Sequence, residues 1–280
     1  MENSIIITIP VYKTSPSEME KESFKQCLKI LHDYNLTLFT YKSLNLKEYI
    51  EIAHAYNKDL TFEFFNKDYF NNIQGYNKLM LSAEFYNRFK GYTYILIYQL
   101  DAWVFYDALE FWCKQNWDYI GAPWIEKENN KTYWVVGNGG LSLRKTDYFI
   151  SLLNSRSKLK SFKQLYKDAH SIKDYILLIP KSLGFHNNIN RFIKSFGDKF
   201  NEDIIYSKFM KNTKFSPQIP CASIAISFAF EKEPSFLYQE NNNKLPFGCH
   251  AFMKYEYETF WKKFITKSKE NGTYNNHNKL

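Results

Sequence analysis

The chain has 280 residues, enough for one large domain or two small ones, and 45% of them are apolar, which is ample for a buried core. We expect no membrane-spanning helix and no secretory signal, because the sequence contains no uninterrupted run of about 18 apolar residues and no basic N-terminal segment leading into one. The net charge of +8 favours phosphate-bearing partners. Four scattered cysteines without a CxxC spacing fit reduced thiols in the cytoplasm.

The first hundred residues alternate between apolar runs and amphipathic segments. The runs at 5–12, 36–41, 61–65 and 92–100 predict strands, and the segments 15–34, 46–56 and 72–89 between them predict helices. Ser17 and Glu20 have the spacing of a capping box at the start of the first helix. This order implies a mainly parallel sheet with helices on both faces, which binds ligands at the carboxyl ends of its strands.

The second half of the chain is less regular. A short strand is predicted at 118–124, and 133–153 reads as a strand, a glycine turn, a second strand and a helix. A helix is predicted to start at 201–210 with Asn201 as its N-cap, and residues 246–252 form a tight loop. The residues from Lys262 onward are polar and are expected to fray.

Asp101 stands out because it interrupts the apolar run "ILIYQLDAWVF", where an unpaired charge is costly. At the end of a strand it could hold a divalent cation that bridges a nucleotide diphosphate. The alternative is that it caps the helix that follows, although Asp107 is better placed for that. In "VVGNGGLSLRK", Gly139 and Gly140 allow the backbone to approach a ligand closely, or simply to turn.

Two further candidates have both structural and chemical interpretations. Glu202 and Asp203 at a predicted helix start are favoured by the helix dipole alone, but one of them could be a general base. His250 in "LPFGCHAF" could be a structural residue, a metal ligand or a partner for phosphate.

The segment 151–200 is strongly basic, with ten Lys and Arg residues against three aspartates. It is either a solvated helix face or a docking surface for an anionic lipid-linked acceptor or membrane surface. Nucleic acid is not an expected partner, because the segment lacks interleaved glycine–aromatic motifs.

The order of these signals resembles the GT-A glycosyltransferases: "QLD" (99–101), "GNGG" (137–140), "ED" (202–203) and "GCH" (248–250). The chain is also similar, over residues 5–260, to an uncharacterised bacterial family of glycosyltransferase-like proteins linked to surface polysaccharide, such as capsule or lipopolysaccharide. That likeness rests on "IPVYK", "GYNKLMLSAEFYNRF", "LIYQLDAWVF", "YIGAPW", "VGNGGLSLR" and "LPFGCHAF". It implies a GT-A, Rossmann-like α/β fold with a smaller acceptor-side subregion.

The resemblance also implies roles for individual residues. Asp203 would be the catalytic base and Glu202 would orient the acceptor, while Asp101 and His250 would bind Mn²⁺ or Mg²⁺. Gln99 replaces the first acid of the D-x-D motif, which bears on metal dependence. The donor would be bound by Pro10, Val11, Tyr12, Lys78, Gln99, Asp101, Gly139 and Gly140.

By this resemblance, residues 1–125 form the donor-binding half and 126–262 the acceptor half of one domain, and 263–280 form a flexible polar tail. The implied function is inverting transfer of a sugar from a nucleotide-sugar donor to a glycan or lipid-linked acceptor. The alternative is an inactive GT-A-like protein that binds a nucleotide or anionic glycan. The expected location is cytoplasmic, with peripheral contact at the inner membrane face.

Overall fold

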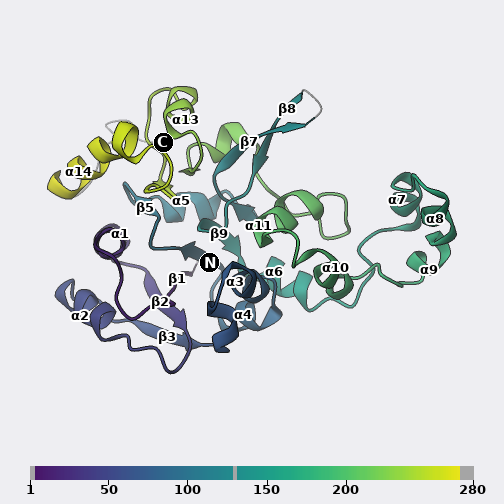
Figure 1. Ribbon diagram of the computed structural model, residues 1–280, viewed down its shortest axis with the longest axis horizontal. Helices are drawn as coiled ribbons and strands as arrows, with labels where there is room; N and C mark the ends of the chain where they lie inside the picture. Colours follow the sequence, from purple (N-terminus) through teal and green to yellow (C-terminus); the bar gives the residue numbers. More distant parts are fainter. Residues whose placement is uncertain (1–3, 129–130, 272–280) are drawn as a thin grey trace.

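The computed structural model describes residues 4–128 and 131–271, and within these ranges six strands form a central sheet in the order β3-β2-β1-β4-β9-β6 (Figure 1). Strands β1 to β4 pair in parallel, whereas β9 runs antiparallel to both β4 and β6. The predicted fold, a GT-A-like α/β domain with a mainly parallel sheet, is confirmed. The strands are β1 (Ile5–Pro10), β2 (Asn35–Thr40), β3 (Thr61–Phe64), β4 (Tyr94–Tyr98), β6 (Tyr119–Ile120) and β9 (Leu141–Lys145).

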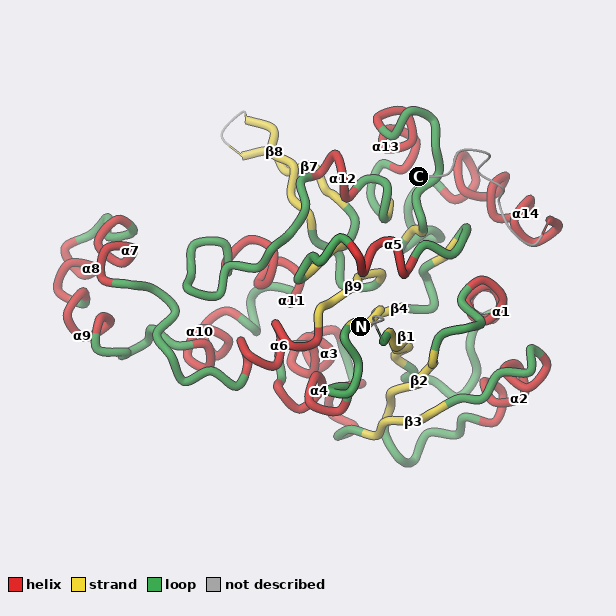
Figure 2. Tube along the Cα trace, turned by 180° about the vertical axis from the view of Figure 1, so that it is seen from behind, coloured by secondary structure: helices red, strands yellow, loops and turns green. Residues whose placement is uncertain are grey.

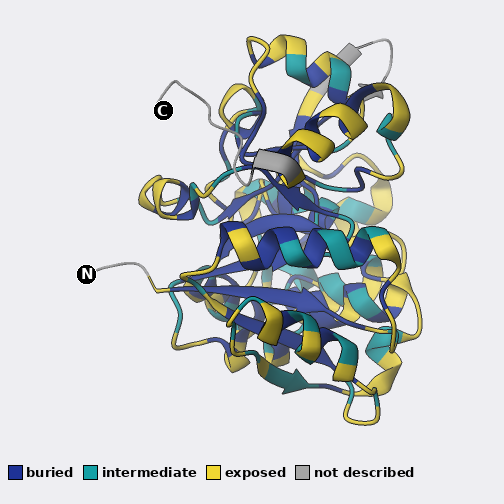
Figure 3. Ribbon diagram, turned by 90° about the vertical axis from the view of Figure 1, so that its left-hand side faces the viewer, coloured by how far each residue is buried: buried dark blue, intermediate teal, exposed yellow. Residues whose placement is uncertain are grey.

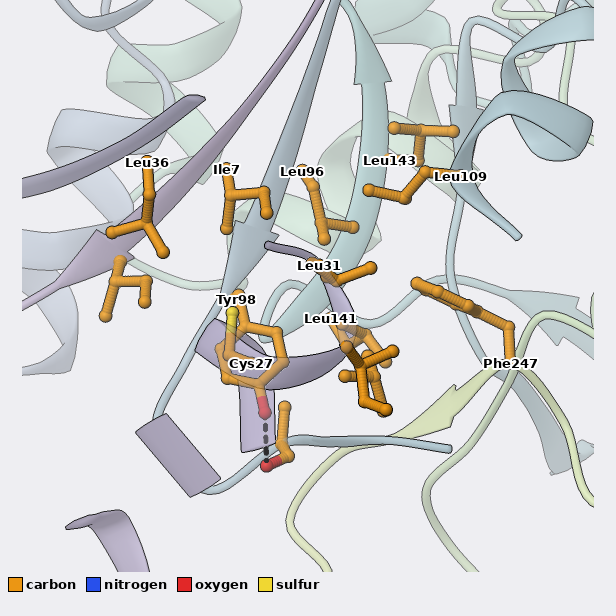
Figure 4. Close-up of a cluster of buried hydrophobic side chains, with 14 of the residues drawn as sticks. Ile7, Cys27, Leu31, Leu36, Leu96, Tyr98, Leu109, Leu141, Leu143 and Phe247 are labelled. Atoms are coloured by element: carbon orange, nitrogen blue, oxygen red, sulfur yellow. Dashed lines mark hydrogen bonds between the residues drawn. The ribbon is translucent and has the colours of Figure 1, made fainter. Parts of the chain in front are cut away.

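Helices cover both faces of this sheet because alternate strand residues point to opposite sides. Ile7 and Leu96 pack on one face with Cys27, a cluster drawn in Figure 4, whereas Ile6 and Ile95 pack on the other with Phe85. The strands are accordingly buried between helices that expose their outer sides (Figure 3). The first face is covered by α1 (Glu18–Ile30), α2 (Lys47–Ala55) and α5 (Leu109–Lys114), the second by α3 (Ile73–Met80), α4 (Ala83–Arg88) and α6 (Thr146–Leu153).

The local signals mostly place the helix ends correctly. Ser17 accepts a hydrogen bond from the Glu20 amide at 3.4 Å and its own amide donates to Glu20 at 2.7 Å, so the predicted capping box is confirmed. The prediction of one continuous helix over 72–89 is wrong. The first helix ends at Met80 and a second begins at Ala83, because the Ser82 hydroxyl accepts a hydrogen bond from the Phe85 amide and caps the second helix.

Smaller elements extend the second half of the chain. A small sheet has the order β10-β11-β5, and a hairpin joins β7 and β8. These strands are β5 (Trp103–Val104), β7 (Pro123–Glu128), β8 (Lys131–Val136), β10 (Ala229–Phe230) and β11 (Gly248–Cys249). The further helices are α7 (Phe162–Lys167), α8 (Ile172–Ile176), α9 (Leu178–Ser182), α10 (Ile189–Phe196), α11 (Glu202–Ile204), α12 (Ala222–Ala225), α13 (Pro234–Glu240) and α14 (Lys262–Asn271), with single turns at Lys67–Phe70, Ile205–Phe209 and Tyr257–Trp261.

The expectation of a frayed polar tail from residue 263 is wrong as far as Asn271, because α14 occupies that segment. Phe264 and Ile265 are buried against the small sheet, and the Ser268 hydroxyl accepts a hydrogen bond from Gln26 at 2.9 Å. Three inward-facing positions are therefore enough to dock a helix whose other residues are polar. Residues 272–280 lie outside the described residues.

None of the helices in the described ranges combines the length and the apolar character that crossing a bilayer requires.

Candidate active site

A cleft of about 710 Å³ lies where β1 and β4 end, as expected for the carboxyl edge of a parallel sheet. The sequence predicts ten site residues besides Lys78, and the structure brings all ten to this cleft. They come from segments up to 240 positions apart: Pro10, Val11, Tyr12, Gln99, Asp101, Gly139, Gly140, Glu202, Asp203 and His250.

A carboxylate–histidine–carboxylate group occupies one part of the cleft. Strands β10 and β11 pair in parallel with Phe230 opposite Cys249, so Glu231 and His250 emerge together at the same edge. Nδ1 of His250 lies 3.1 Å from Oε1 of Glu231, and Nε2 lies 3.2 Å from Oδ1 of Asp101. Burial opposes protonation of His250, but the two carboxylates outweigh it and raise its pKa to about 10.

This group explains how the chain tolerates a charge at Asp101. Burial by itself would raise the pKa of the Asp101 carboxyl, but the neighbouring His250 imidazolium lowers the pKa below its usual value. The same holds for Glu231: burial by itself would raise the pKa of its carboxyl, but His250 lowers that pKa below its usual value. These partly buried ions therefore compensate one another within the chain, while the Asp101 side chain stays 37% exposed.

The glycine turn has a steric reason to be glycine. A Cβ on Gly140 would overlap the His250 ring, and a Cβ on Gly139 would overlap the Glu202 carboxylate. Asn138 holds the turn with a φ of 75°, and its Oδ1 accepts hydrogen bonds from the amides of Gly140 at 2.8 Å and Leu141 at 3.1 Å. The turn thus lets its backbone lie against two of the predicted site residues.

Glu202 is held in a buried ion pair. Its Oε1 lies 2.7 Å from Nη2 of Arg144, a fully buried residue of β9, whose Nη1 also donates to the Tyr86 hydroxyl at 2.8 Å. A charge-assisted hydrogen bond to a buried guanidinium fixes the direction of the carboxylate. Glu202 therefore acts as a fixed negative charge next to Asp203.

Asp203 is the titratable carboxyl group of the cleft. Burial, and then the negative charge of Glu202, raise its pKa to about 7, while its Oδ1 accepts a hydrogen bond from the Ile204 amide at 2.7 Å. A carboxyl group with a pKa near 7 can take up and release a proton in neutral solution. The structure therefore distinguishes the two acids by their contacts: Glu202 is paired with Arg144, whereas Asp203 accepts a hydrogen bond from a backbone amide and has a raised pKa.

The structure departs from the prediction for Lys78 and, in part, from the prediction for Asn201. Lys78 lies outside the cleft, with a side chain that is 58% exposed and 3.3 Å from Asp198. Neighbouring residues of a helix point about 100° apart, and in α3 the inward position belongs to Asn77. Asn201 is the N-cap residue of α11, as predicted, but its side chain makes no capping hydrogen bond and instead accepts from Asn77 at 3.0 Å.

Several other residues line the cleft although the sequence patterns did not single them out. Lys13 and Lys254 line the cleft, and Lys13 is paired there with Glu20 at 2.5 Å. Glu231 had a usable signal, since it follows the apolar run "ISFAF" just as Asp101 follows its own strand. Arg144 had none, because an arginine at the end of a strand usually points to solvent.

The donors on one side of His250 fit a divalent cation. Nε2 of His250 lies 3.2 Å from both Oδ1 of Asp101 and Oε1 of Gln99, and Glu231 on Nδ1 can hold the imidazole with Nε2 as the ligand. A cation there would compete with the imidazolium proton. Within residues 4–128 and 131–271 no three His, Cys, Asp or Glu side chains form a metal site, so such a cation would draw its other ligands from Gln99 and its substrate.

The fold and cleft define a GT-A-like α/β protein with an acidic and a cationic group in one site. The chain belongs to the family described as "Protein of unknown function (DUF5672)", whose model matches residues 59–250. No curated protein sequence matches it.

Two solved structures are similar in fold. One is core-mannan synthase A (CmsA/Ktr4) from Aspergillus fumigatus in its Mn/GDP form, with 10% identity, a TM-score of 0.49, and coverage of 77% of this chain and 72% of that one. The other is 4-diphosphocytidyl-2C-methyl-D-erythritol synthase, with 9% identity, a TM-score of 0.35, and coverage of 55% and 80%.

Proposed function

We propose that the protein is an inverting glycosyltransferase that moves a sugar from a nucleotide-sugar donor to a hydroxyl group of a glycan or lipid-linked acceptor. The observation that carries this proposal is the presence, in one cleft, of cationic groups and of Asp203, a buried carboxyl group that titrates near pH 7. Sugar transfer needs both, because the leaving diphosphate gains negative charge while the acceptor hydroxyl loses a proton.

Lys13, Lys254 and the His250 imidazolium are the groups that would receive the diphosphate. Cationic donors that surround a developing negative charge lower the barrier most when water is excluded. A divalent cation bound by Asp101, Gln99 and His250 would replace the imidazolium proton and supply the positive charge at the same place. Pro10, Val11 and Tyr12, at the end of β1, would contact the base and ribose.

Asp203 would accept the proton of the acceptor hydroxyl as its oxygen bonds to the anomeric carbon. The bond from that carbon to the diphosphate oxygen breaks with its electron pair, so a single displacement inverts the configuration. Glu202 would not take this role, because its carboxylate is held by the ion pair with Arg144. Its remaining role would be to keep negative charge beside Asp203, which holds the pKa of that carboxyl near 7.

The first test is thermal unfolding with UDP-, GDP-, CMP- and dTDP-sugars, each with Mn²⁺, Mg²⁺ or EDTA. A donor at 100 times its Kd should stabilise the protein by about 2.7 kcal/mol, a shift of several degrees. Loss of the shift in EDTA would assign a metal to Asp101 and His250, and its persistence would assign the diphosphate to the lysines. Absence of any shift across the panel would contradict the proposal.

A second function is favoured by the replacement of the first motif acid by Gln99 and by the contact between Asp101 and His250. On this alternative the protein binds a nucleotide or an anionic glycan without turnover. Slow hydrolysis of the donor in the absence of acceptor distinguishes the two. An active enzyme should release free sugar at a rate that depends on Asp203. A binding protein should show a higher unfolding temperature with the donor but release no sugar.

A further inference from the structure

Residues 158–188 form a helical lobe that projects from the rest of the molecule. It contains α7, α8 and α9, and it stands apart from the central sheet in both views of the chain (Figures 1 and 2). Its two ends are fastened together, since the Leu159 amide donates to the Asn187 carbonyl at 2.9 Å and Lys158 bridges to Asn188. The lobe is therefore a closed unit on a narrow base.

The lobe has a very small core for its apolar content. Within the described residues its own buried cluster consists of Leu165, Ala169 and Leu178. Larger apolar side chains are left in solvent at 49% to 82% exposure: Phe162, Tyr166, Ile172, Tyr175, Ile176, Ile179, Leu183 and Phe185. Scattered exposed apolar residues are ordinary, but eight of them in one small lobe, with the rings of Tyr166 and Tyr175 in contact, mark a surface that binds something.

The aliphatic members of this set lie on one face. Ile172, Ile176, Ile179 and Leu183 recur at intervals of four, three and four residues, the repeat that places side chains along one side of a helix. They span α8 and α9, which follow each other with helical hydrogen bonds across Leu177. Pro180 lacks the amide that would bond to the Ile176 carbonyl, which explains the break between the two short helices.

The charge of the lobe identifies the chemistry of what it contacts. Between residues 158 and 188 the sequence holds six lysines and two aspartates. The two aspartates are already paired, Asp168 with Lys160 at 2.7 Å and Asp174 with Lys181 at 3.6 Å. The lysines in excess are exposed: Lys158, Lys163, Lys167 and Lys173. A surface that pairs exposed aliphatic and aromatic side chains with surplus lysines is complementary to anionic phospholipid.

We infer that the helical lobe docks on a bilayer that contains anionic phospholipid, with the aliphatic face of α8–α9 inserted at the headgroup boundary and the surplus lysines among the phosphates. Insertion removes apolar surface from water, and the lysines add electrostatic attraction. The inference rests on the lobe alone and is independent of the proposed sugar transfer.

The test is flotation of the full chain with vesicles of phosphatidylethanolamine and phosphatidylglycerol (2:1) and with vesicles of phosphatidylcholine. The wild type should bind the anionic vesicles at least a hundredfold more tightly than the phosphatidylcholine vesicles. Replacing Ile176, Ile179 and Leu183 by Ser, a change made wholly on the exposed aliphatic face, should abolish binding to both. The charge variant Lys163→Gln, Lys167→Gln, Lys173→Gln should lose roughly a hundredfold on anionic vesicles, about fivefold for each lysine.

The matched control is Lys47→Gln, Lys114→Gln, Lys262→Gln, which removes the same charge from exposed lysines elsewhere. It should change binding less than threefold, and thermal unfolding should show that all variants fold. Equal losses in the control and the charge variant, or equal binding to the two kinds of vesicle, would overturn the inference. So would a wild-type dimer that the Ser variant converts to a monomer while vesicle binding is absent, because the face would then join two copies of the chain.

Discussion

The cleft and the helical lobe depart from ordinary burial in opposite directions. The cleft buries charged groups, including Arg144, Glu202 and Asp203, whereas the lobe exposes large apolar side chains such as Ile172 and Leu183. In the cleft the chain itself offsets the cost of burying charge. Arg144 and Glu202 lie beside each other as an ion pair, and Asp203 has a raised pKa, so it can be protonated and uncharged. The exposed apolar face of the lobe has no such compensation within its own small core.

This difference separates two ways in which a sequence records function. A buried ionic network is costly unless every charged group in it has a partner. All of its partners are therefore expected within the chain, and its geometry can be interpreted from the chain alone. An exposed apolar face is complete only with a partner, so its meaning depends on what covers it. The variants below test whether the cleft is self-sufficient in this sense.

The largest expected effect is on catalysis at Asp203. Asp203→Asn should lower sugar transfer, or donor hydrolysis without acceptor, by 10²- to 10⁴-fold, because the amide cannot accept the acceptor proton. In the wild type the rate should rise about tenfold per pH unit up to pH 7 and then level off, since the base works only when ionised. The measurement is the pH–rate profile at saturating donor.

Glu202→Gln is the matched control for that experiment. It should keep a pH-dependent rate but move the inflection of the profile to lower pH, because it removes the charge that raises the pKa of Asp203. It should also lose stability, because Arg144 is left buried without its counter-ion, so the profile is measured well below the unfolding temperature of the variant. An unchanged profile in Asp203→Asn would assign the base to another residue and would break the distinction drawn between the two acids.

Arg144→Met should have the next largest effect. It leaves Glu202 buried without its counter-ion, which typically costs 3–5 kcal/mol of folding free energy. Urea unfolding measures the loss. The double variant Arg144→Met, Glu202→Gln should recover most of it, because the uncompensated charge is gone. A loss below 1 kcal/mol in the single variant would mean that Glu202 reaches solvent or takes a proton.

The third effect concerns stability and pH. A carboxyl group whose folded pKa is raised binds its proton more tightly in the folded chain, so it destabilises the fold progressively as pH rises from about 4 to 7. Asp203→Asn does not titrate and should be more stable than the wild type at pH 8, by up to roughly 4 kcal/mol, but not at pH 4. Urea midpoints at both values measure this. Equal stabilisation at the two pH values would mean that burial of a titrating charge is not the cause.

The central sheet could be predicted from the sequence because its signals are local. Apolar runs, amphipathic spacing and the Ser17–Glu20 capping box each act over a few residues, and the order of strands and helices then implies a parallel sheet. The break at Ser82 was missed because a serine in an amphipathic run is compatible with both a helix interior and a cap. The docking of α14 could not be predicted because only three of its side chains are buried and its ion pair with α1, Lys269 to Glu22 at 3.0 Å, has no local signal.

The cleft could be predicted in part for a related reason. Asp101, Glu202, Asp203 and His250 were recognised because polar groups at strand or helix ends are visible in a sequence. Their pairing was not visible, since Arg144 and Glu231 reach them through long-range packing. The sequence also offered no way to tell Lys78 from Lys254, because which face of an element points inward depends on the tertiary fold.

That correction leads to the smallest predicted effect. Lys254→Ala should weaken binding of the nucleotide diphosphate about tenfold, the typical loss for a hydrogen bond to a charged group. Lys78→Ala removes the same charge outside the cleft, where it faces Asp198, and should leave affinity unchanged. Calorimetric titration with the donor nucleotide measures both. If instead Lys78→Ala weakens binding and Lys254→Ala does not, the diphosphate lies beside Lys78, outside the cleft. The placement of Lys78 in the donor site by its sequence motif would then be right, and the placement of the donor by the cleft geometry would be wrong.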